Sequence, residues 1–211
     1  SELGQTDWSV DDSQGFSGLS TAAWDVWPVT KDAFAAALRC FPPFPYVRES
    51  RRLVGIETLR NADLVRADGR ALKNYPAAMA LGEYPVDIHG SHLDRFMEHD
   101  LGESAASFPS GWEPSRGVFQ IPFGVFVPET IDGLLAAEKN ISVSRLVNGA
   151  IRLQPAVMLA GQAVGTIAAC AVRKGCEVRD VEPMDVQLHL LDAGSRLSME
   201  TFADVPEGSA E

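Results

Sequence analysis

Histidine and aspartate side chains gather in the stretch Tyr84–Asp100. It contains His89, His92 and His99 beside Asp87 and Asp94. An imidazole titrates near neutral pH, so a histidine here can act as a general acid or base. Mixed His/Asp clusters can also hold zinc or iron. Because the spacing H-x2-H-x6-H matches no strong metal motif, we expect one site histidine and no bound metal.

A second group of chemically useful side chains, Arg48, Arg51 and Arg52, precedes the apolar residues that begin at Leu53. A guanidinium presents paired donors that suit a carboxylate or a phosphate. The group is therefore either a substrate- or anion-binding site or a solvated turn of charged residues. The sequence alone leaves both interpretations open.

A polar loop that contains a glycine precedes a long apolar run. Asn148, Gly149 and Arg152 lie just before Gln154 and Pro155. Proline suits the first turn of a helix, where its missing N–H costs nothing. A helix that begins here would present free N–H groups and its positive dipole end to a hydrogen-bond acceptor.

The run Pro155–Val172 carries no charge. Arg173 and Lys174 suit the last turn of a helix, and Gly175 suits the position just after its end. These signals predict a helix to Lys174. Its length would also allow a membrane span. Because the run is built from alanine, glycine and polar residues rather than leucine, isoleucine and phenylalanine, we expect no membrane span.

Small residues dominate the predicted helix: Ala160, Gly161, Gly165, Ala168 and Ala169. A glycine inside a helix costs about 1 kcal/mol relative to alanine, which favours a need for close approach at these positions. We therefore expect a helix that is buried on all sides. Either a flat ligand or ordinary packing of a helix on a sheet would explain the glycines.

The remaining predicted elements are helices over Lys31–Cys40, Asn61–Ala67 and Pro183–Asp192, and strands over Leu53–Ile56, Val118–Val127 and Ile131–Ala137. A loop, Asn140–Arg152, follows the last of these strands. The order of strand, polar loop and long helix predicts a mixed α/β fold.

Composition limits the class of protein. The 211 residues carry a net charge of −11, which argues against nucleic acid or an anionic membrane as the main partner. Three cysteines without a C-x-x-C motif form no disulfide framework. No signal peptide opens the chain, and because it begins with Ser1 we expect residues to be missing upstream. The compartment stays open.

Three segments together resemble a known family: PYVRESRRLVG from Pro45, YPVDIH from Tyr84, and IPFGVFVPETIDGLLAAEKNISVSRLVNGAIRLQPAVMLAGQAVGTIAA from Ile121. In this order they look like the C-terminal half of the bacterial FAD-dependent oxidoreductases, which have a glutathione-reductase-type flavin fold. The chain departs from the pattern at Arg145 and at Glu138-Lys139, where relatives often carry histidine and Gly-Arg. It contains no G-x-G-x-x-G, the turn that holds a dinucleotide phosphate.

The resemblance implies a role for several residues. His89 would be the substrate-side acid or base, and the helix from Pro155 would direct its N-terminus at the flavin. The cofactor-binding residues would be Asn148, Gly149, Arg152, Gln154, Pro155, Gly161, Gln162 and Gly165.

The resemblance also implies a division of the chain. Residues 1–44 would be an extended N-terminal segment with a short helix, and residues 45–130 part of a substrate domain that contains strands. Residues 131–197 would supply the last strand and the helices of the FAD-binding domain, and residues 198–211 an acidic tail.

The implied function is flavin-mediated hydride transfer from a small organic substrate. It would need a partner chain or upstream segment that supplies the G-x-G-x-x-G half. Two alternatives remain open: a non-catalytic remnant or accessory subunit that binds no flavin, and a metal-dependent enzyme that uses the His/Asp cluster.

Overall fold

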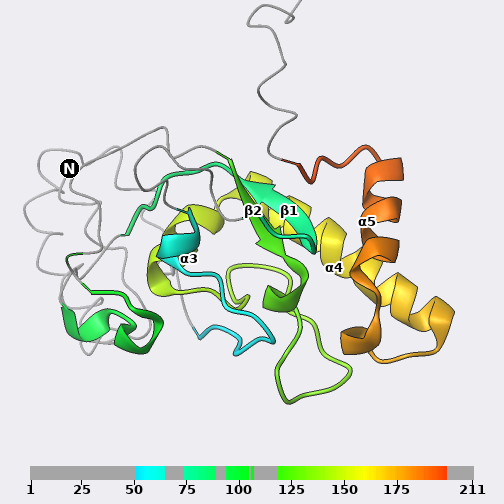
Figure 1. Cartoon of the computed structure of the whole chain (residues 1–211), viewed down its shortest axis with the longest axis horizontal. Coiled ribbons are helices and arrows are strands. Elements are labelled where there is room, and N and C mark those ends of the chain that lie inside the picture. The colour runs from blue at the N-terminus through cyan, green and yellow to red at the C-terminus, as the bar shows by residue number, and fades with distance from the viewer. Residues whose placement is uncertain (1–50, 65–73, 89–93, 105, 107–117, 199–211) are drawn as a thin grey trace, which may run out of the picture. The chain divides into compact units, whose positions relative to one another are not determined.

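The computed structural model describes residues 51–64, 74–88, 94–104, 106 and 118–198 (Figure 1). The chain divides into two compact units, Ser1–Arg51 with Ile88–Phe96 and Arg52–Asp87 with Met97–Glu211. The described part of the first unit includes the short 3-10 helix η3 (Asp94–Phe96). All other described elements belong to the second unit.

Several sequence predictions lie outside the described residues. They are the helix Lys31–Cys40, the arginine Arg48 and the candidate catalytic histidine His89. His92 lies outside them as well.

Two antiparallel strands form the sheet of the second unit. β1 (Ala78–Gly82) pairs with β2 (Phe119–Pro122), with Ala80 opposite Ile121 and an irregularity in register between Ala78 and Ala80. Every residue of both strands is buried. The strand predicted over Val118–Val127 is thus confirmed only in its first part. Pro122 cannot donate to a ladder, and the chain continues as the 3-10 helix η6 (Phe123–Val125).

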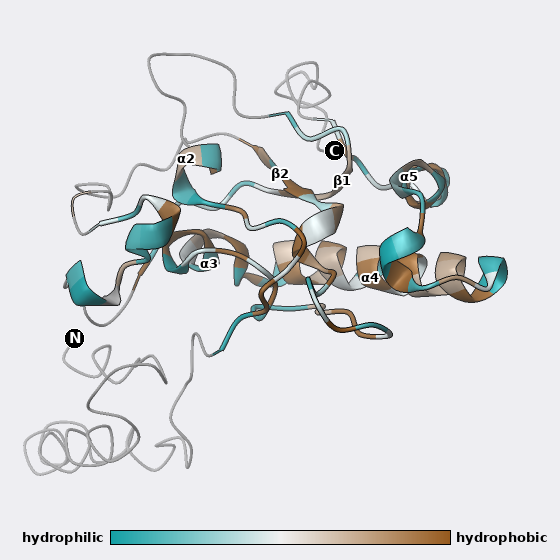
Figure 2. Ribbon diagram, turned by 60° about the horizontal axis from the view of Figure 1, so that its bottom comes forward, coloured by the Kyte–Doolittle hydropathy of each residue, from teal (hydrophilic) through white to brown (hydrophobic). Residues whose placement is uncertain are grey.

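Helix α4 (Gln154–Lys174) is the longest described helix and packs against β1 and against α5 (Pro183–Asp192). In Figure 2 α4 lies in the plane of the picture while α5 is seen nearly end-on, so the two helices cross steeply. Both helices were predicted from sequence and are confirmed. Gly175 has the left-handed conformation expected after a helix end, with φ of 63°.

Only one side of α4 is buried. The buried residues are Ala156, Ala160, Ala163, Ile167, Cys170 and Ala171. On the other side Met158 is 74% exposed and Val172 is 83% exposed. The prediction of a helix buried on all sides is therefore wrong for this structure. The sequence misled because both faces of the helix are small or apolar, so no polar stripe marks the exposed one.

The strand predicted over Ile131–Ala137 is also wrong. The chain there is irregular, with Gly133 at φ of 67°, and Ile131 and Leu134 are about half exposed. The positive φ turns the chain, and no described strand lies beside this stretch to pair with it. The apolar residues of this stretch were therefore not sufficient to predict a buried strand.

A helix replaces most of the loop predicted over Asn140–Arg152. α3 (Arg145–Ile151) begins after Ser144, whose side chain accepts a hydrogen bond from the backbone N–H of Val147 at 3.3 Å. All seven residues of α3 are buried. Sequence signals for it existed, since serine is a good N-cap and apolar residues follow at helical spacing, but Gly149 suggested a loop.

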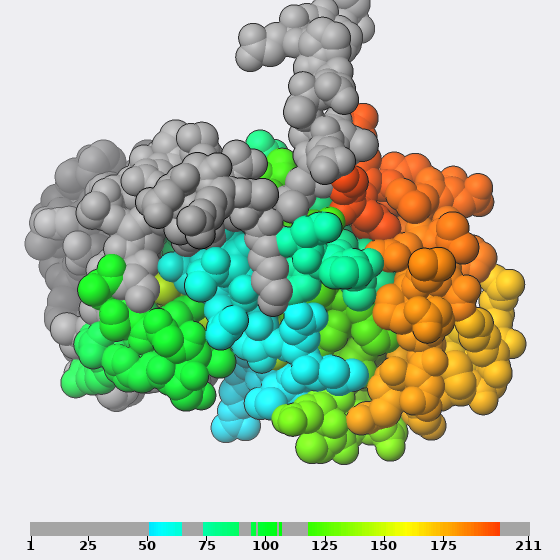
Figure 3. All heavy atoms as spheres, viewed as in Figure 1, coloured from blue at the N-terminus to red at the C-terminus, as the bar shows by residue number. Residues whose placement is uncertain are grey.

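The segment predicted as a strand over Leu53–Ile56 forms an isolated bridge rather than a strand, between Gly55 and Pro128. The N–H of Ile56 donates to the carbonyl of Val127 at 2.9 Å. Figure 3 shows residues 128–134 (yellow-green) lying beside residues 52–57 (cyan). The predicted helix Asn61–Ala67 is described only as α2 (Asn61–Leu64).

Two short 3-10 helices complete the described structure: η4 (His99–Leu101) and η7 (Val178–Asp180). Helix α4 is long and apolar enough to cross a membrane by length and composition. One such helix is weak support for a span, because core helices of globular proteins pass the same test.

Candidate functional site

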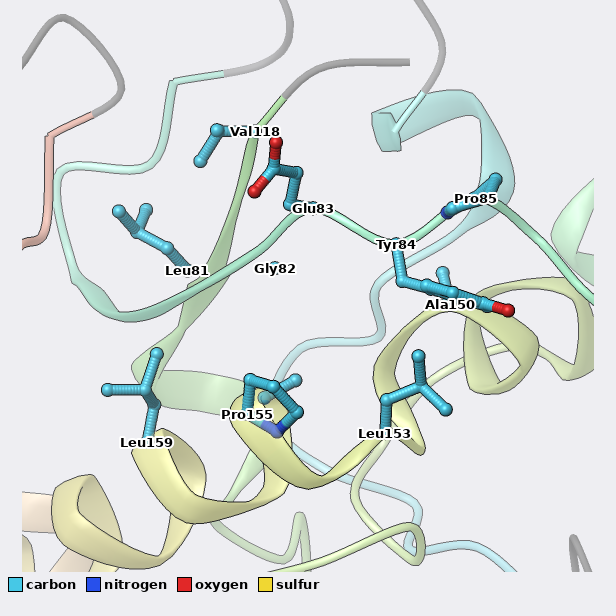
Figure 4. Close-up of a pocket in the computed structure, with 11 residues that line it drawn as sticks. Leu81, Gly82, Glu83, Tyr84, Pro85, Val118, Ala150, Leu153, Pro155 and Leu159 are labelled. Atoms are coloured by element: carbon cyan, nitrogen blue, oxygen red, sulfur yellow. The ribbon is translucent and has the colours of Figure 1, made fainter. Parts of the chain in front are cut away.

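A pocket of about 460 Å³ opens where α4 begins. One side is formed by the end of β1 and the residues after it, 81–85, together with Val118; the other is formed by Ala150 and the first turns of α4. Figure 4 shows Leu153, Pro155 and Leu159 facing residues 81–85 across the opening. The lining is apolar apart from the exposed Glu83 and the phenol of Tyr84. Such walls suit a flat, largely apolar ligand.

The N-terminus of α4 lies at this pocket and lacks a side-chain cap. Its N-cap is Leu153, and no side-chain cap hydrogen bond occurs among the described residues there. Pro155 has no N–H, which leaves the backbone N–H groups of Gln154 and Ala156 as the donors of the first turn. The apolar pocket therefore lies beside the positive dipole end of α4, whose first turn carries N–H groups without a side-chain cap.

Arg152 lies between α3 and α4 and does not point freely into solvent. Its Nη2 donates to the backbone carbonyl oxygen of Asp87 at 2.9 Å and to the Asp87 carboxylate at 3.2 Å. The Arg152 side chain is only 7% exposed. Arg152 is thus paired with a carboxylate directly before the start of α4.

Asn148 and Gly149 lie in the buried helix α3 rather than in the predicted loop. A Cβ atom at Gly149 would lie 2.6 Å from the carbonyl oxygen of Asp87, so only glycine fits. Asn148 is buried, and its Nδ2 donates to the carbonyl of Lys139 at 2.6 Å. Its Oδ1 has no hydrogen-bond partner among the described residues. Neither residue lines the pocket.

Gly161, Gln162 and Gly165 lie on the exposed side of α4, away from the pocket lining. A Cβ atom at either glycine would meet no described atom within 4 Å. The close approach expected at these glycines therefore does not occur within the described part of the chain.

Of the predicted arginine cluster, Arg48 lies outside the described residues, and Arg51 and Arg52 lie within them. Arg51 and Arg52 belong to different units. Arg52 forms an ion pair with Glu98, and its side chain is 14% exposed. Glu98 also accepts a hydrogen bond from the backbone N–H of Arg145 at 2.6 Å, so its carboxylate occupies the N-terminus of α3.

Glu103 is, like Glu98, a carboxylate whose contacts the sequence did not predict. It is 3% exposed and accepts a hydrogen bond from the backbone N–H of Asn61 at 2.8 Å. Burial raises its pKa above the ordinary value of 4.5, and nearby Glu98 raises it too, while hydrogen bonds from Ser144 and Asn61 oppose the shift. Burial likewise raises the pKa of the Tyr75 phenol above its usual range.

Within the described ranges, no group of three or more histidine, cysteine, aspartate or glutamate residues could hold a metal ion. His89 and His92, which suggested the metal alternative, lie outside those ranges.

An apolar pocket beside an uncapped helix N-terminus can bind a flat ligand that carries a hydrogen-bond acceptor on its rim. Comparison with family models identifies the class. The model described as FAD dependent oxidoreductase matches residues 7–190, so the chain belongs to that family. Its function is flavin-linked redox chemistry, and its cofactor is FAD. Searches among curated proteins and among solved structures find no match.

Proposed function

We propose that the chain takes part in flavin-mediated hydride transfer from a small organic substrate, with the flavin ring held in the pocket at the start of α4. The observation that carries this proposal is the combination of apolar walls with the uncapped N-terminus of a 21-residue helix. The rings of a flavin suit the walls, and the carbonyl groups at its pyrimidine edge suit the N–H donors. When bound, the flavin supplies the two-electron chemistry.

The residues of this chain would hold and polarise the flavin. The N–H groups of Gln154 and Ala156 would donate to the pyrimidine edge, and the helix dipole would favour the negative charge that reduction places there. Arg152, just before the helix, would add a permanent positive charge. Asn148 and Gly149 would act indirectly, by fixing α3 and the turn into α4.

His89 remains our candidate for the substrate-side acid or base, because it follows Asp87 by two residues and imidazole titrates near neutral pH. Arg48, Arg51 and Arg52 remain candidates for binding a carboxylate or other anion of the substrate. Arg52 already pairs with Glu98, so a substrate anion would have to compete with that carboxylate.

The adenine half of FAD would be held by a chain or segment that carries G-x-G-x-x-G, which these 211 residues lack. Two exposed apolar surfaces support such a partner. One is the outer face of α4, with Met158 74% and Val172 83% exposed. The other consists of Val54, Ile56, Ile131 and Leu134, which are all between 46% and 69% exposed. A protein surface of this kind is suited to docking.

The test is to produce the 211-residue chain alone and together with a chain that supplies the G-x-G-x-x-G half. We expect weak or no FAD binding alone and one flavin per complex when both are present, measured by visible absorption after gel filtration. Tight FAD binding by the chain alone would contradict the partner requirement. A complex that forms but holds no flavin would support the accessory-subunit alternative.

Hydride transfer is tested on the flavin-loaded complex. Anaerobic mixing with candidate substrates should bleach the flavin, and a substrate deuterated at the transferred hydrogen should bleach it more slowly. Replacing His89 with alanine should slow bleaching without releasing flavin. Loss of flavin in that variant would contradict a substrate-side role.

A further inference from the structure

Asp87 is held in place by contacts with two residues, Arg152 and Gly149. Its carbonyl and carboxylate oxygens both accept hydrogen bonds from Arg152, at 2.9 and 3.2 Å. Its backbone packs against Gly149, where a Cβ atom would approach the Asp87 carbonyl oxygen to 2.6 Å and its carbonyl carbon and nitrogen to 3.0 Å. No described atom of Asp87 lines the pocket itself.

Both walls of the pocket contain close sequence neighbours of the residues that make these contacts. Tyr84 and Pro85, two to three residues before Asp87, line one wall. Ala150 and Leu153, immediately next to Gly149 and Arg152, line the other (Figure 4). A displacement of residue 87 relative to the α3–α4 turn would therefore change the width of the pocket and the direction of the first turn of α4.

The carboxylate matters because its partner is nearly buried. The Arg152 side chain is 7% exposed, and the Asp87 side chain 25%. A guanidinium cannot lose its charge by deprotonation at ordinary pH, so removing the carboxylate would leave a desolvated cation with one fewer acceptor. The turn would then be expected to rearrange so that Arg152 reaches water.

We propose that Asp87 is a positioning residue for the flavin pocket: by holding Arg152 and Gly149 it fixes residues 81–85 against the start of α4. The inference rests on the proposed placement of the flavin in this pocket. It assigns to Asp87 a role that requires no contact with cofactor or substrate.

The first experiment needs no flavin. Amide hydrogen exchange of the full chain is compared for wild type, Asp87→Ala and Asp87→Asn. We expect Asp87→Ala to exchange severalfold faster over residues 149–157, and Asp87→Asn, which keeps a side-chain oxygen acceptor, to restore most of the protection. Equal exchange in Asp87→Ala and wild type would overturn the proposal, as would an Asp87→Asn variant no better than Asp87→Ala.

A matched control exists elsewhere in the chain. Arg179 pairs with Asp132 at 2.6 Å and also donates to the backbone carbonyls of Pro128, Glu129 and Ile131. This is again an Asp–Arg pair with added carbonyl acceptors, but away from the pocket lining. Asp132→Ala should therefore leave exchange over residues 149–157 unchanged. Faster exchange there in both alanine variants would indicate general loosening and contradict a local role for Asp87.

The second experiment uses the flavin-loaded complex. Asp87→Ala should weaken FAD binding severalfold and alter the shape of the flavin absorption band, and Asp87→Asn should restore both. If the chain binds no flavin either alone or with a partner chain, the proposed function is wrong. The hydrogen-exchange result would still test whether Asp87 holds the α3–α4 turn. If flavin binds but neither property changes in Asp87→Ala, the positioning role is overturned and the proposed function survives.

Discussion

The carboxylate of Glu98 accepts a hydrogen bond from the backbone N–H of Arg145 at 2.6 Å and forms an ion pair with Arg52. It thereby ties together three parts of the chain that are far apart in sequence: residues 52, 98 and 145. A carboxylate at a helix N-terminus is stabilising because it faces the positive end of the helix dipole and free N–H groups.

Glu98→Gln should lower the free energy of unfolding by roughly 1–2 kcal/mol, because the amide keeps an acceptor but loses the charge that Arg52 and the α3 terminus attract. Urea denaturation of the full chain measures this. Arg52→Gln and the double variant complete a mutant cycle. Additive effects of the two substitutions would contradict a coupled pair.

Glu103 makes stability depend on pH in the direction opposite to most carboxylates. Its folded pKa is raised, chiefly by burial, so the folded state holds its proton more tightly than the unfolded state does. The stabilising contribution is therefore complete below the ordinary pKa of 4.5 and is lost as the pH rises through the folded pKa.

Glu103→Gln removes this titration while keeping an oxygen that can accept from the N–H of Asn61. The variant should become more stable relative to wild type as pH rises above 4.5, by at most about 1.4 kcal/mol per pH unit, until the folded pKa is passed. Urea melts at a series of pH values give the difference, with Glu182→Gln on the exposed surface as the matched control. A difference that shrinks with rising pH would show that the shift has the other sign.

Two glycines in helices should respond to alanine with opposite signs. At Gly149 the new Cβ would lie 2.6 Å from a backbone oxygen of Asp87, and overpacking of this kind costs typically about 1–3 kcal/mol. At Gly161 the new Cβ would meet no described atom within 4 Å, so Gly161→Ala should gain helix propensity, up to about 1 kcal/mol. Thermal melts of the full chain compare the two variants. Equal destabilisation would contradict the exposed placement of Gly161.

Because Gly161 and Gly165 are exposed, substitutions there can test whether a partner chain docks on the outer face of α4. Gly161→Leu and Gly165→Leu should fold as stably as wild type, because both positions are open in the described structure. Each should nevertheless fail to assemble with a chain that carries the G-x-G-x-x-G half, if that chain packs closely on this face. Gel filtration of the mixtures measures assembly, and Ala193→Leu, at an exposed position outside α4, is a control for added bulk. Normal assembly in both glycine variants would remove this face from the proposed interface.

Sequence signals were sufficient to predict the helix ends, because helix ends depend on residues within one turn. Pro155 and Gly175 mark both ends of α4, and Pro183 marks the start of α5; each effect acts within a turn of the helix. The resemblance to the FAD-dependent oxidoreductases was also confirmed, while the C-terminal-half and bacterial parts of it stay predictions. By contrast, α3 was missed because Gly149 looked like a loop residue. It is in fact the point where another backbone segment touches the helix.

The contacts around the pocket could not be predicted from local pattern. Glu98 lies 47 residues from Arg145, and Asp87 lies 65 residues from Arg152, so nothing in sequence spacing pairs them. Nor does hydropathy distinguish the two faces of α4, because the buried face consists of alanine, isoleucine and cysteine while the exposed face also carries apolar residues such as Met158 and Val172. Which face is covered depends on β1 and α5, and their positions are tertiary information.

Arg152 yields the prediction that bears most directly on redox chemistry. If its guanidinium acts on the flavin, Arg152→Ala should lower the midpoint potential, because a lost positive charge makes a negatively charged reduced flavin harder to form. We expect tens of millivolts, since about 30 mV corresponds to about 1.4 kcal/mol in a two-electron couple. The Asp87 carboxylate lies 3.2 Å from Nη2 of Arg152 and offsets part of its positive charge. We therefore expect the shift in potential to be at the lower end of this range.

The direction in which a second variant shifts the midpoint potential distinguishes an electrostatic effect from a structural one. Asp87→Asn keeps an acceptor for Arg152 but removes the offsetting negative charge, so it should raise the midpoint potential while Arg152→Ala lowers it. Redox titration of the flavin-loaded complex, at two ionic strengths, measures both shifts against wild type. An unchanged potential in Arg152→Ala would assign this arginine to holding Asp87 alone. Shifts of the same sign in both variants would indicate a displaced flavin rather than a change of charge, because only an electrostatic effect reverses when the opposite charge is removed.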